Sequence, residues 1–261
     1  MPLATSAEEA MQRCRQVEVN GRRYTLAEYV GAAPQKGIYV DGNEVNDNGL
    51  PQAFLVMQPP GAVTPAHFHE PNQFQVFVEG DGRIGPHPTT PLTVQYANGH
   101  TTYGPIVASD VGIRYFTLRQ RWDPGAKYMP ASRDKLVKGN QRARVKGGLA
   151  VSSDAERSAR SGVSVETVFP SGEDGLAGWL YRLGPGDECT LPEPSVSGGQ
   201  YLVVTAGALT MGDAELARHS AAFIRPAEPA FRVVAGQSGL DLLVLQFPRL
   251  LAKAKQTVVP V

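Results

Sequence analysis

Two histidines separated by one residue, His67 and His69, constrain this chain more than any other feature. In an extended chain, residues two apart point to the same face, so both imidazoles are expected to project together. A turn over Glu70-Pro71-Asn72 follows, and Gln73 then begins a second extended run that returns its side chain to the histidines. Two imidazoles and one side-chain oxygen that converge are suited to binding a divalent metal.

The spacing around these histidines resembles the first signature of the cupin superfamily, which reads Gly, five residues, His-x-His, three residues, Glu, six residues, Gly. Gly61, His67, His69 and Gly80 match this pattern, and Gln73 stands at the glutamate position. A neutral amide oxygen can bind a metal, but it lacks the charge attraction of a carboxylate, so the metal affinity is expected to be lower. The alternative is that Gln73 serves the hydrogen-bond network of its strand.

An internal repeat divides the chain into two similar halves. Six residues recur at one constant offset of 127 positions, which is too long a period for a solenoid and indicates two similar modules in tandem. The matched pairs are Gln73 and Gln200, Gly80 and Gly207, Val107 and Val234, Ala108 and Ala235, Gly112 and Gly239, and Leu118 and Leu245.

The repeat and the resemblance together predict an all-β protein of two tandem jelly-roll (cupin) β-barrels, a bicupin, with a short N-terminal helix. Residues 1–125 are expected to form the N-terminal barrel with the metal site, 126–160 a linker, and 161–261 a degenerate C-terminal barrel. The basic residues between 119 and 160 indicate either a solvated linker or an anion-binding patch.

Local patterns place individual elements within this plan. A capping box at Ser6-Ala7-Glu8-Glu9 predicts a helix from about Ala7 to Cys14. Alternating or continuous apolar runs predict strands. These are expected at residues 38–40, 54–57, 74–78, 92–96 and 113–118.

The histidines are distributed unequally between the halves. Four of the five lie in the first half, and the constant offset leads from His67 and His69 to Pro194 and Val196. The second half therefore cannot hold a metal with the same ligands, and its expected role is structural.

A fourth ligand is expected near residues 98–105, where the resemblance implies a second histidine-bearing signature. His100 is the natural candidate, and Tyr103 fits the position about as well. The predicted metal ligands are thus His67, His69, Gln73 and His100, and the predicted substrate-binding residues are Tyr103, Gln75 and Phe77. Gln73, Gln75 and Phe77 are expected on one face of their strand, and Phe77 serves either the pocket or the core.

Composition excludes several classes of function. The 25 basic and 25 acidic residues leave no net charge to attract nucleic acid or an anionic membrane. No apolar run reaches the length of a membrane span, and the N-terminus lacks the pattern of a signal peptide. Cys14 and Cys189 are far apart and are expected to be buried and reduced in a cytoplasmic protein.

Bicupins similar to this chain are often dioxygenases that act on small aromatic or enol substrates. The resemblance therefore implies a metal-dependent oxidoreductase, with Fe(II) favoured and Mn(II), Ni(II) or Zn(II) possible. Two alternatives stay open: a non-catalytic module that binds a small molecule, and a cupin isomerase or lyase. A small-molecule substrate and a homodimer are the expected partners.

Overall fold

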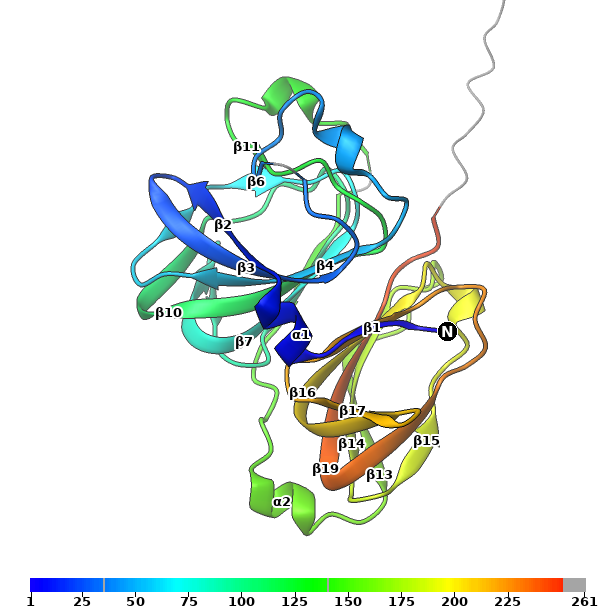
Figure 1. The fold of residues 1–261 in the computed structure, drawn as a ribbon. Coiled ribbons are helices and arrows are strands. Elements are labelled where there is room, and N and C mark those ends of the chain that lie inside the picture. Colours follow the sequence, from blue (N-terminus) through cyan, green and yellow to red (C-terminus); the bar gives the residue numbers. More distant parts are fainter. Residues whose placement is uncertain (35, 140, 251–261) are drawn as a thin grey trace, which may run out of the picture.

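The computed structural model describes residues 1–34, 36–139 and 141–250. It contains two β-rich lobes built from successive halves of the chain, as Figure 1 shows. Each lobe is organised around one large antiparallel sheet that curls into a barrel of jelly-roll type. The predicted all-β class with two tandem barrels is confirmed.

The N-terminal barrel is a nine-stranded sheet whose main order is β12-β9-β7-β10-β4-β3-β2, with β5 paired to β10 and β8 to β7. A separate two-stranded sheet pairs β6 (His67–Phe68) with β11 (Lys127–Tyr128). The strands of the large sheet are β2 (Cys14–Val19), β3 (Arg22–Val30), β4 (Gln52–Gln58), β5 (Val63–Thr64), β7 (Gln73–Ile84), β8 (His87–Thr89), β9 (Val94–Ala97), β10 (Ile106–Arg119) and β12 (Ala143–Lys146).

The C-terminal barrel is an eight-stranded sheet of main order β1-β18-β16-β19-β14-β13, with β15 paired to β19 and β17 to β16. The run β9-β7-β10-β4-β3 in the first sheet thus has the same topology as β18-β16-β19-β14-β13 in the second. Its strands are β1 (Leu3–Thr5), β13 (Val163–Phe169), β14 (Ala177–Leu183), β15 (Glu188–Thr190), β16 (Gln200–Met211), β17 (Ala214–Ala217), β18 (Ala221–Ile224) and β19 (Arg232–Gln246).

Two repeated glycines explain part of the sequence repeat. Gly80 and Gly207 lie at irregular points of the β7–β10 and β16–β19 pairings, with φ values of 70° and 71°. A Cβ at Gly80 would lie 2.1 Å from the carbonyl oxygen of Gly112, and one at Gly207 would lie 1.9 Å from that of Gly239. Only glycine combines this backbone conformation with so close an approach of the neighbouring strand.

Helices are few and short among the described residues. They are α1 (Ala7–Gln12), α2 (Asp154–Ser158) and the 3-10 turns η1 (Asn43–Asn46), η2 (Arg133–Lys135) and η3 (Pro194–Val196). The predicted capping box is present, since the Ser6 hydroxyl accepts from the backbone N–H of Glu9 while the Glu9 carboxylate accepts from that of Ser6. The helix ends at Gln12, two residues early, because Cys14 already pairs with Ala27 in the sheet.

The expected linker, 126–160, contributes strands to the N-terminal barrel. Lys127–Tyr128 pairs with β6, and Ala143–Lys146 extends the large sheet beside β9. In the opposite sense, Leu3–Thr5 from the first half pairs with β18 of the second. The boundaries at 125 and 160 themselves stay a prediction, and residues 251–261 lie outside the described part of the chain.

Two smaller expectations are wrong. The strand expected at residues 38–40 is a single bridge between Ile38 and Ala126. Cys14 is exposed and Cys189 is half-buried, because both lie on strands near a sheet edge; both are free thiols.

No helix within the described ranges is long and apolar enough to cross a membrane.

One hydrophobic core is shared by the two barrels. Phe74 of the first barrel packs edge-on against Phe247 of the second, with ring centroids 4.8 Å apart. The hydroxyl of Tyr201 donates to the backbone carbonyls of Gln52 and Arg119, at 2.9 and 3.2 Å. The second barrel therefore packs against strands β4 and β10 of the first and hydrogen-bonds to them.

Candidate functional site

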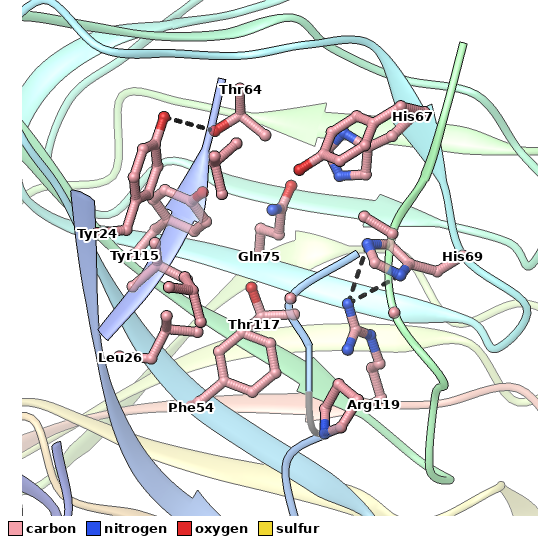
Figure 2. Close-up of a pocket in the computed structure, with 18 of the residues that line it drawn as sticks. Tyr24, Leu26, Phe54, Thr64, His67, His69, Gln75, Tyr115, Thr117 and Arg119 are labelled. Atoms are coloured by element: carbon pink, nitrogen blue, oxygen red, sulfur yellow. Dashed lines mark hydrogen bonds between the residues drawn. The ribbon is translucent and has the colours of Figure 1, made fainter. Parts of the chain in front are cut away.

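A pocket opens inside the N-terminal barrel and contains both histidines of the motif (Figure 2). Its cavity volume is about 80 Å³. A water needs roughly 10–15 Å³ by this measure, so the cavity has room for a few waters or a small organic molecule.

Two chain segments outside the large sheet form part of the pocket wall. Gly37 lies on one and Ala126 on the other, and both line the cavity. The Asn43 amide ties the segments together, because its nitrogen donates to the carbonyls of Ile38 and Pro124 at 3.1 and 2.7 Å. The two segments are therefore fixed to each other beside the pocket.

His67 and His69 lie side by side on the wall of this pocket. Their ring centroids are 5.1 Å apart and their planes are nearly perpendicular. The Nδ1 atom of His67 is 2.7 Å from the carbonyl oxygen of Pro65, and that of His69 is 2.7 Å from Oδ2 of Asp123. Both partners are acceptors, so each Nδ1 carries the proton and each Nε2 keeps its lone pair.

Both imidazoles are neutral at physiological pH. Burial, followed by the neighbouring His69, lowers the pKa of His67 to about 3. Burial and then the positive charge of Arg119 lower the pKa of His69, and the Asp123 carboxylate offsets only part of this effect. Neutral imidazole is the form that binds a metal.

Asp123 is fully buried and orients this part of the site. Burial alone would raise its pKa, but His69 and Arg119 outweigh that effect and hold the pKa below the usual range. The carboxylate also accepts from the backbone N–H groups of Gly125 and Glu70, at 3.0 and 3.2 Å. It is therefore a fixed anion behind His69.

Arg119 places a positive charge beside the histidines. One guanidinium nitrogen lies 3.1 and 3.0 Å from the two ring nitrogens of His69. The lone pairs of these nitrogens diverge, so a donor equidistant from both covers the ring and does not lie along either one. The other guanidinium nitrogens donate to Gln73 Oε1 at 3.2 Å and to Gln52 Oε1 at 2.9 Å.

Tyr103 occupies the place where the second signature was expected to supply a histidine. Reciprocal backbone hydrogen bonds of 3.1 and 3.0 Å join it to His67, and the two rings lie 4.6 Å apart. Its hydroxyl accepts a hydrogen bond from the Gln73 amide. Burial raises the pKa of Tyr103 well above its usual value, so the phenol keeps its proton.

His100 does not line the pocket. Its φ of 59° turns the chain, and its ring packs on Phe68 with centroids 5.5 Å apart. Phe68 points away from the cavity because it alternates with His67 and His69. The structure thus brings together His67, His69, Gln73 and Tyr103, and leaves His100 outside this group.

The predicted substrate-binding residues also separate. Gln75 lines the pocket, with its amide oxygen accepting from Gln95 at 3.4 Å. Phe77 packs in the hydrophobic core against Tyr115 and is not among the lining residues. The core role that the sequence left open for Phe77 is therefore the observed one.

Two of the four predicted ligands, His67 and His69, are arranged as metal ligands. His67 and His69 each present an Nε2 lone pair with Nδ1 fixed by an acceptor, which is the usual arrangement of metal-binding histidines. Gln73 has its oxygen engaged by Arg119 and its nitrogen by Tyr103. Within the described part of the chain, no group of three or more His, Cys, Asp or Glu side chains could hold a metal ion.

Sequence reasoning missed Arg119 and Asp123, which lie where the first barrel was expected to end. The signal that could have located Arg119 is the repeat itself. Arg119 pairs with Gln73 as Gln246 pairs with Gln200, so the constant offset leads from one pair to the other. Asp123 follows Arg119 by four residues and has no counterpart in the motif.

Comparisons with known proteins show the fold. No protein-family model and no curated protein sequence matches the chain. A "putative dioxygenase" from Nostoc punctiforme is similar, with a TM-score of 0.61 and 12% identity over 98% of this chain and 85% of that one. The oxalate decarboxylase of Lactobacillus farciminis, solved as a formate complex, has a TM-score of 0.54 and 13% identity, over 95% and 86% of the two chains.

Vicilin from Corylus avellana (hazelnut) is also similar, with a TM-score of 0.52 and 10% identity over 94% of this chain and 85% of that one. These neighbours are cupin-fold proteins, so the chain has the cupin fold. Because their names differ so widely, the fold does not by itself select an activity.

Proposed function

We propose that the N-terminal barrel binds a divalent transition metal through Nε2 of His67 and His69 and catalyses a dioxygenase-type oxidation of a small aromatic or enol substrate. Fe(II) is the favoured ion, and Mn(II), Ni(II) and Zn(II) are the alternatives. Such an ion supplies Lewis acidity and, where it is redox-active, a path for electrons.

The observation that carries this proposal is the state of the two imidazoles. Each has its Nδ1–H committed to a fixed acceptor, and burial keeps each ring neutral. Nε2 of His67 has no hydrogen-bond partner among the described residues, and Nε2 of His69 has the Arg119 guanidinium 3.0 Å away. Fixing the Nδ1–H of both rings in this way is the usual arrangement of metal-binding histidines. The name of the Nostoc punctiforme neighbour supports the reaction class by analogy only.

Each of the other residues has a role that follows from its contacts. Tyr103 retains a proton beside His67 and can donate a hydrogen bond to a substrate oxygen. Arg119 and Asp123 form a buried ion pair, with 3.4 Å between guanidinium nitrogen and carboxylate oxygen. The pair orients His69 and leaves the pocket close to neutral overall.

Elemental analysis of metal-replete protein tests the metal. Wild type is expected to hold about one ion per chain. His67→Ala is expected to lose it, and His100→Ala, which alters a histidine outside the pocket, is expected to retain it. Oxygen consumption with a panel of small phenols and enols then tests the reaction class. Wild-type protein that stays empty after supplementation would end the metal proposal.

A second function, metal-independent binding of a small molecule, is favoured by one specific observation. Gln73, at the glutamate position of the signature, is fully engaged by Arg119 and Tyr103. A ligand-induced thermal shift that is unaffected by chelator would select this function. Turnover without oxygen consumption would instead indicate an isomerase or lyase.

Homodimer formation and a cytoplasmic location stay predictions. Light scattering of the purified protein measures its mass in solution, and twice the mass of one chain is the result expected for a homodimer.

A further inference from the structure

Four side chains form a row across the inner face of the N-terminal barrel. In the sheet register, Phe54 of β4 pairs with Thr117 of β10, Thr117 with Gln75 of β7, and Gln75 with Gln95 of β9. Directly paired side chains on one face lie roughly 5 Å apart, so they contact one another. Phe54, Thr117 and Gln75 line the pocket, and Figure 2 shows the Gln75 amide in its middle with Thr117 beside it.

The C-terminal barrel has the same row with apolar side chains. Trp179 pairs with Val244, Val244 with Leu202, and Leu202 with Ala222. All four belong to, or pack against, a hydrophobic core cluster. Three polar side chains of the first barrel, Thr117, Gln75 and Gln95, thus stand where the second barrel has a valine, a leucine and an alanine, and Thr117 and Gln75 are the two that line the pocket.

The two polar side chains have unused hydrogen-bonding atoms. Gln75 is 2% exposed and Thr117 is 3% exposed. Among the described residues, Gln75 Nε2 and Thr117 Oγ1 have no hydrogen-bond partner. Neither is one of the fully buried polar atoms without a partner, so both keep some accessible surface. Both atoms therefore face the cavity and are able to bond to a molecule in it, whereas the second barrel fills the same two positions with apolar side chains.

We propose that Gln75 and Thr117 form a subsite that binds one neutral oxygen, a hydroxyl or a carbonyl, of the small molecule in the pocket. The amide nitrogen donates one hydrogen bond to this oxygen, and the threonine hydroxyl donates or accepts a second. Neither group carries charge, so the subsite itself offers a ligand hydrogen bonds and no ion pair. Waters held by the same two atoms are displaced when the ligand enters.

The remainder of the pocket agrees with this ligand class. Leu26, Phe54 and Val56 provide apolar walls beside the subsite, which suit a ring or a short hydrocarbon body. The subsite narrows the substrate of the proposed function to a small apolar molecule with a neutral oxygen. Only the statement that this molecule is a substrate rests on the proposed function.

A matched pair of probes tests the subsite. We choose 4-fluorophenol and fluorobenzene, which differ by one hydroxyl, and follow binding to the full chain by fluorine NMR, with chelator throughout. Wild type is expected to bind 4-fluorophenol about tenfold more tightly, as two ordinary hydrogen bonds would give. The variant Gln75→Leu/Thr117→Val, which carries the residues of the second barrel, is expected to bind the two probes equally.

Thr101→Val is the matched control, because the Thr101 hydroxyl is also buried without a partner but lies outside the pocket. It is expected to keep the tenfold preference. The single isosteric variant Thr117→Val, expected to retain about a threefold preference, serves if the double variant does not fold.

Three results would overturn the subsite: equal binding of the two probes by wild type, no binding of either, or an unchanged preference in the folded variants. A melting temperature lowered by several degrees in Gln75→Leu/Thr117→Val would also count against it, since it would show that the polar pair stabilises the barrel. Because chelator is present throughout, the result is independent of whether the protein binds a metal.

Discussion

Gln73 and Arg119 lie directly opposite each other on β7 and β10, as Gln200 and Gln246 do on β16 and β19. In the first pair the guanidinium donates to the amide oxygen at 3.2 Å, and in the second one amide donates to the other at 2.9 Å. The glutamine thus joins two strands in both barrels, with or without histidines nearby. This favours the strand-network role for Gln73, and it identifies Arg119 as a specific feature of the first barrel.

Replacing Arg119 by the residue of the second barrel, Arg119→Gln, is expected to raise the affinity for Zn(II) or Co(II) at least tenfold. The substitution removes a buried positive charge beside His69 and frees the Gln73 oxygen. Titration calorimetry measures the change, with Arg121→Gln as the control because Arg121 donates to the backbone carbonyl of Glu70 and does not line the pocket. An unchanged affinity would show that no metal approaches His69.

Replacing Asp123 by asparagine is expected to lower metal affinity by about 10- to 100-fold. Loss of the carboxylate makes Nε2 of His69 a weaker electron-pair donor to the metal and fixes the orientation of the ring less firmly. Competition with a coloured chelator gives the affinity directly. Asp174→Asn, which alters a carboxylate paired with Arg142 away from the pocket, is the control; an equal loss in both variants would contradict the prediction.

The stability of the metal-free protein is expected to fall as the pH decreases from about 6.5 towards 3. His67 has an ordinary pKa of about 6.5 when unfolded and a pKa of about 3 when folded, so the unfolded chain takes up the proton first. Its contribution is complete above pH 6.5 and is lost on acidification, by at most about 1.4 kcal/mol per pH unit. The lowered pKa of Asp123 adds a further loss below about pH 4.

Urea unfolding at several pH values measures this dependence. His67→Gln is expected to flatten the slope between pH 6 and pH 4 by about 1 kcal/mol per unit. The exposed His87 provides the matched variant, His87→Gln, for which the wild-type slope is expected. If the slope survived in His67→Gln, the buried neutral state of His67 would be wrong.

Tyr201→Phe is expected to lower the free energy of unfolding by about 1 kcal/mol, because the phenol donates to carbonyls of two strands of the other barrel. Phenylalanine fits the position, since Phe74 holds the matching place in the first barrel. Chemical denaturation checks the value. Tyr181→Phe, at a tyrosine whose hydroxyl has no hydrogen bond among the described residues, is expected to change little, and equal losses would show that the contact between barrels is not responsible.

The elements that the sequence predicted correctly are those fixed by local pattern. His67 and His69 share a face because two-residue spacing requires it, and the helix after Ser6 begins at a complete capping box. The repeat predicted two similar modules, and the two large sheets share the strand order β9-β7-β10-β4-β3 and β18-β16-β19-β14-β13.

The features that the sequence could not supply depend on contacts between distant segments. Tyr103 enters the site through a bridge to His67, across 36 positions of chain, and His100 leaves it through a left-handed turn. Asp123 reaches His69 only after the chain has left β10 and passed over the mouth of the barrel. No spacing rule around His67 contains this information, because it is the tertiary path that brings these residues together.

The first strand of the chain, β1, belongs to the sheet of the second half, and this matters for whether the two halves can be separated. Residues at the very start complete a sheet whose other strands come from the last hundred or so positions, through the pairing of Leu3–Thr5 with Ala221–Phe223. Cutting the chain at its midpoint would leave the later fragment with a bare strand edge open to self-association. The C-terminal half is therefore not a self-contained unit, because the first residues of the chain cover the edge of its sheet.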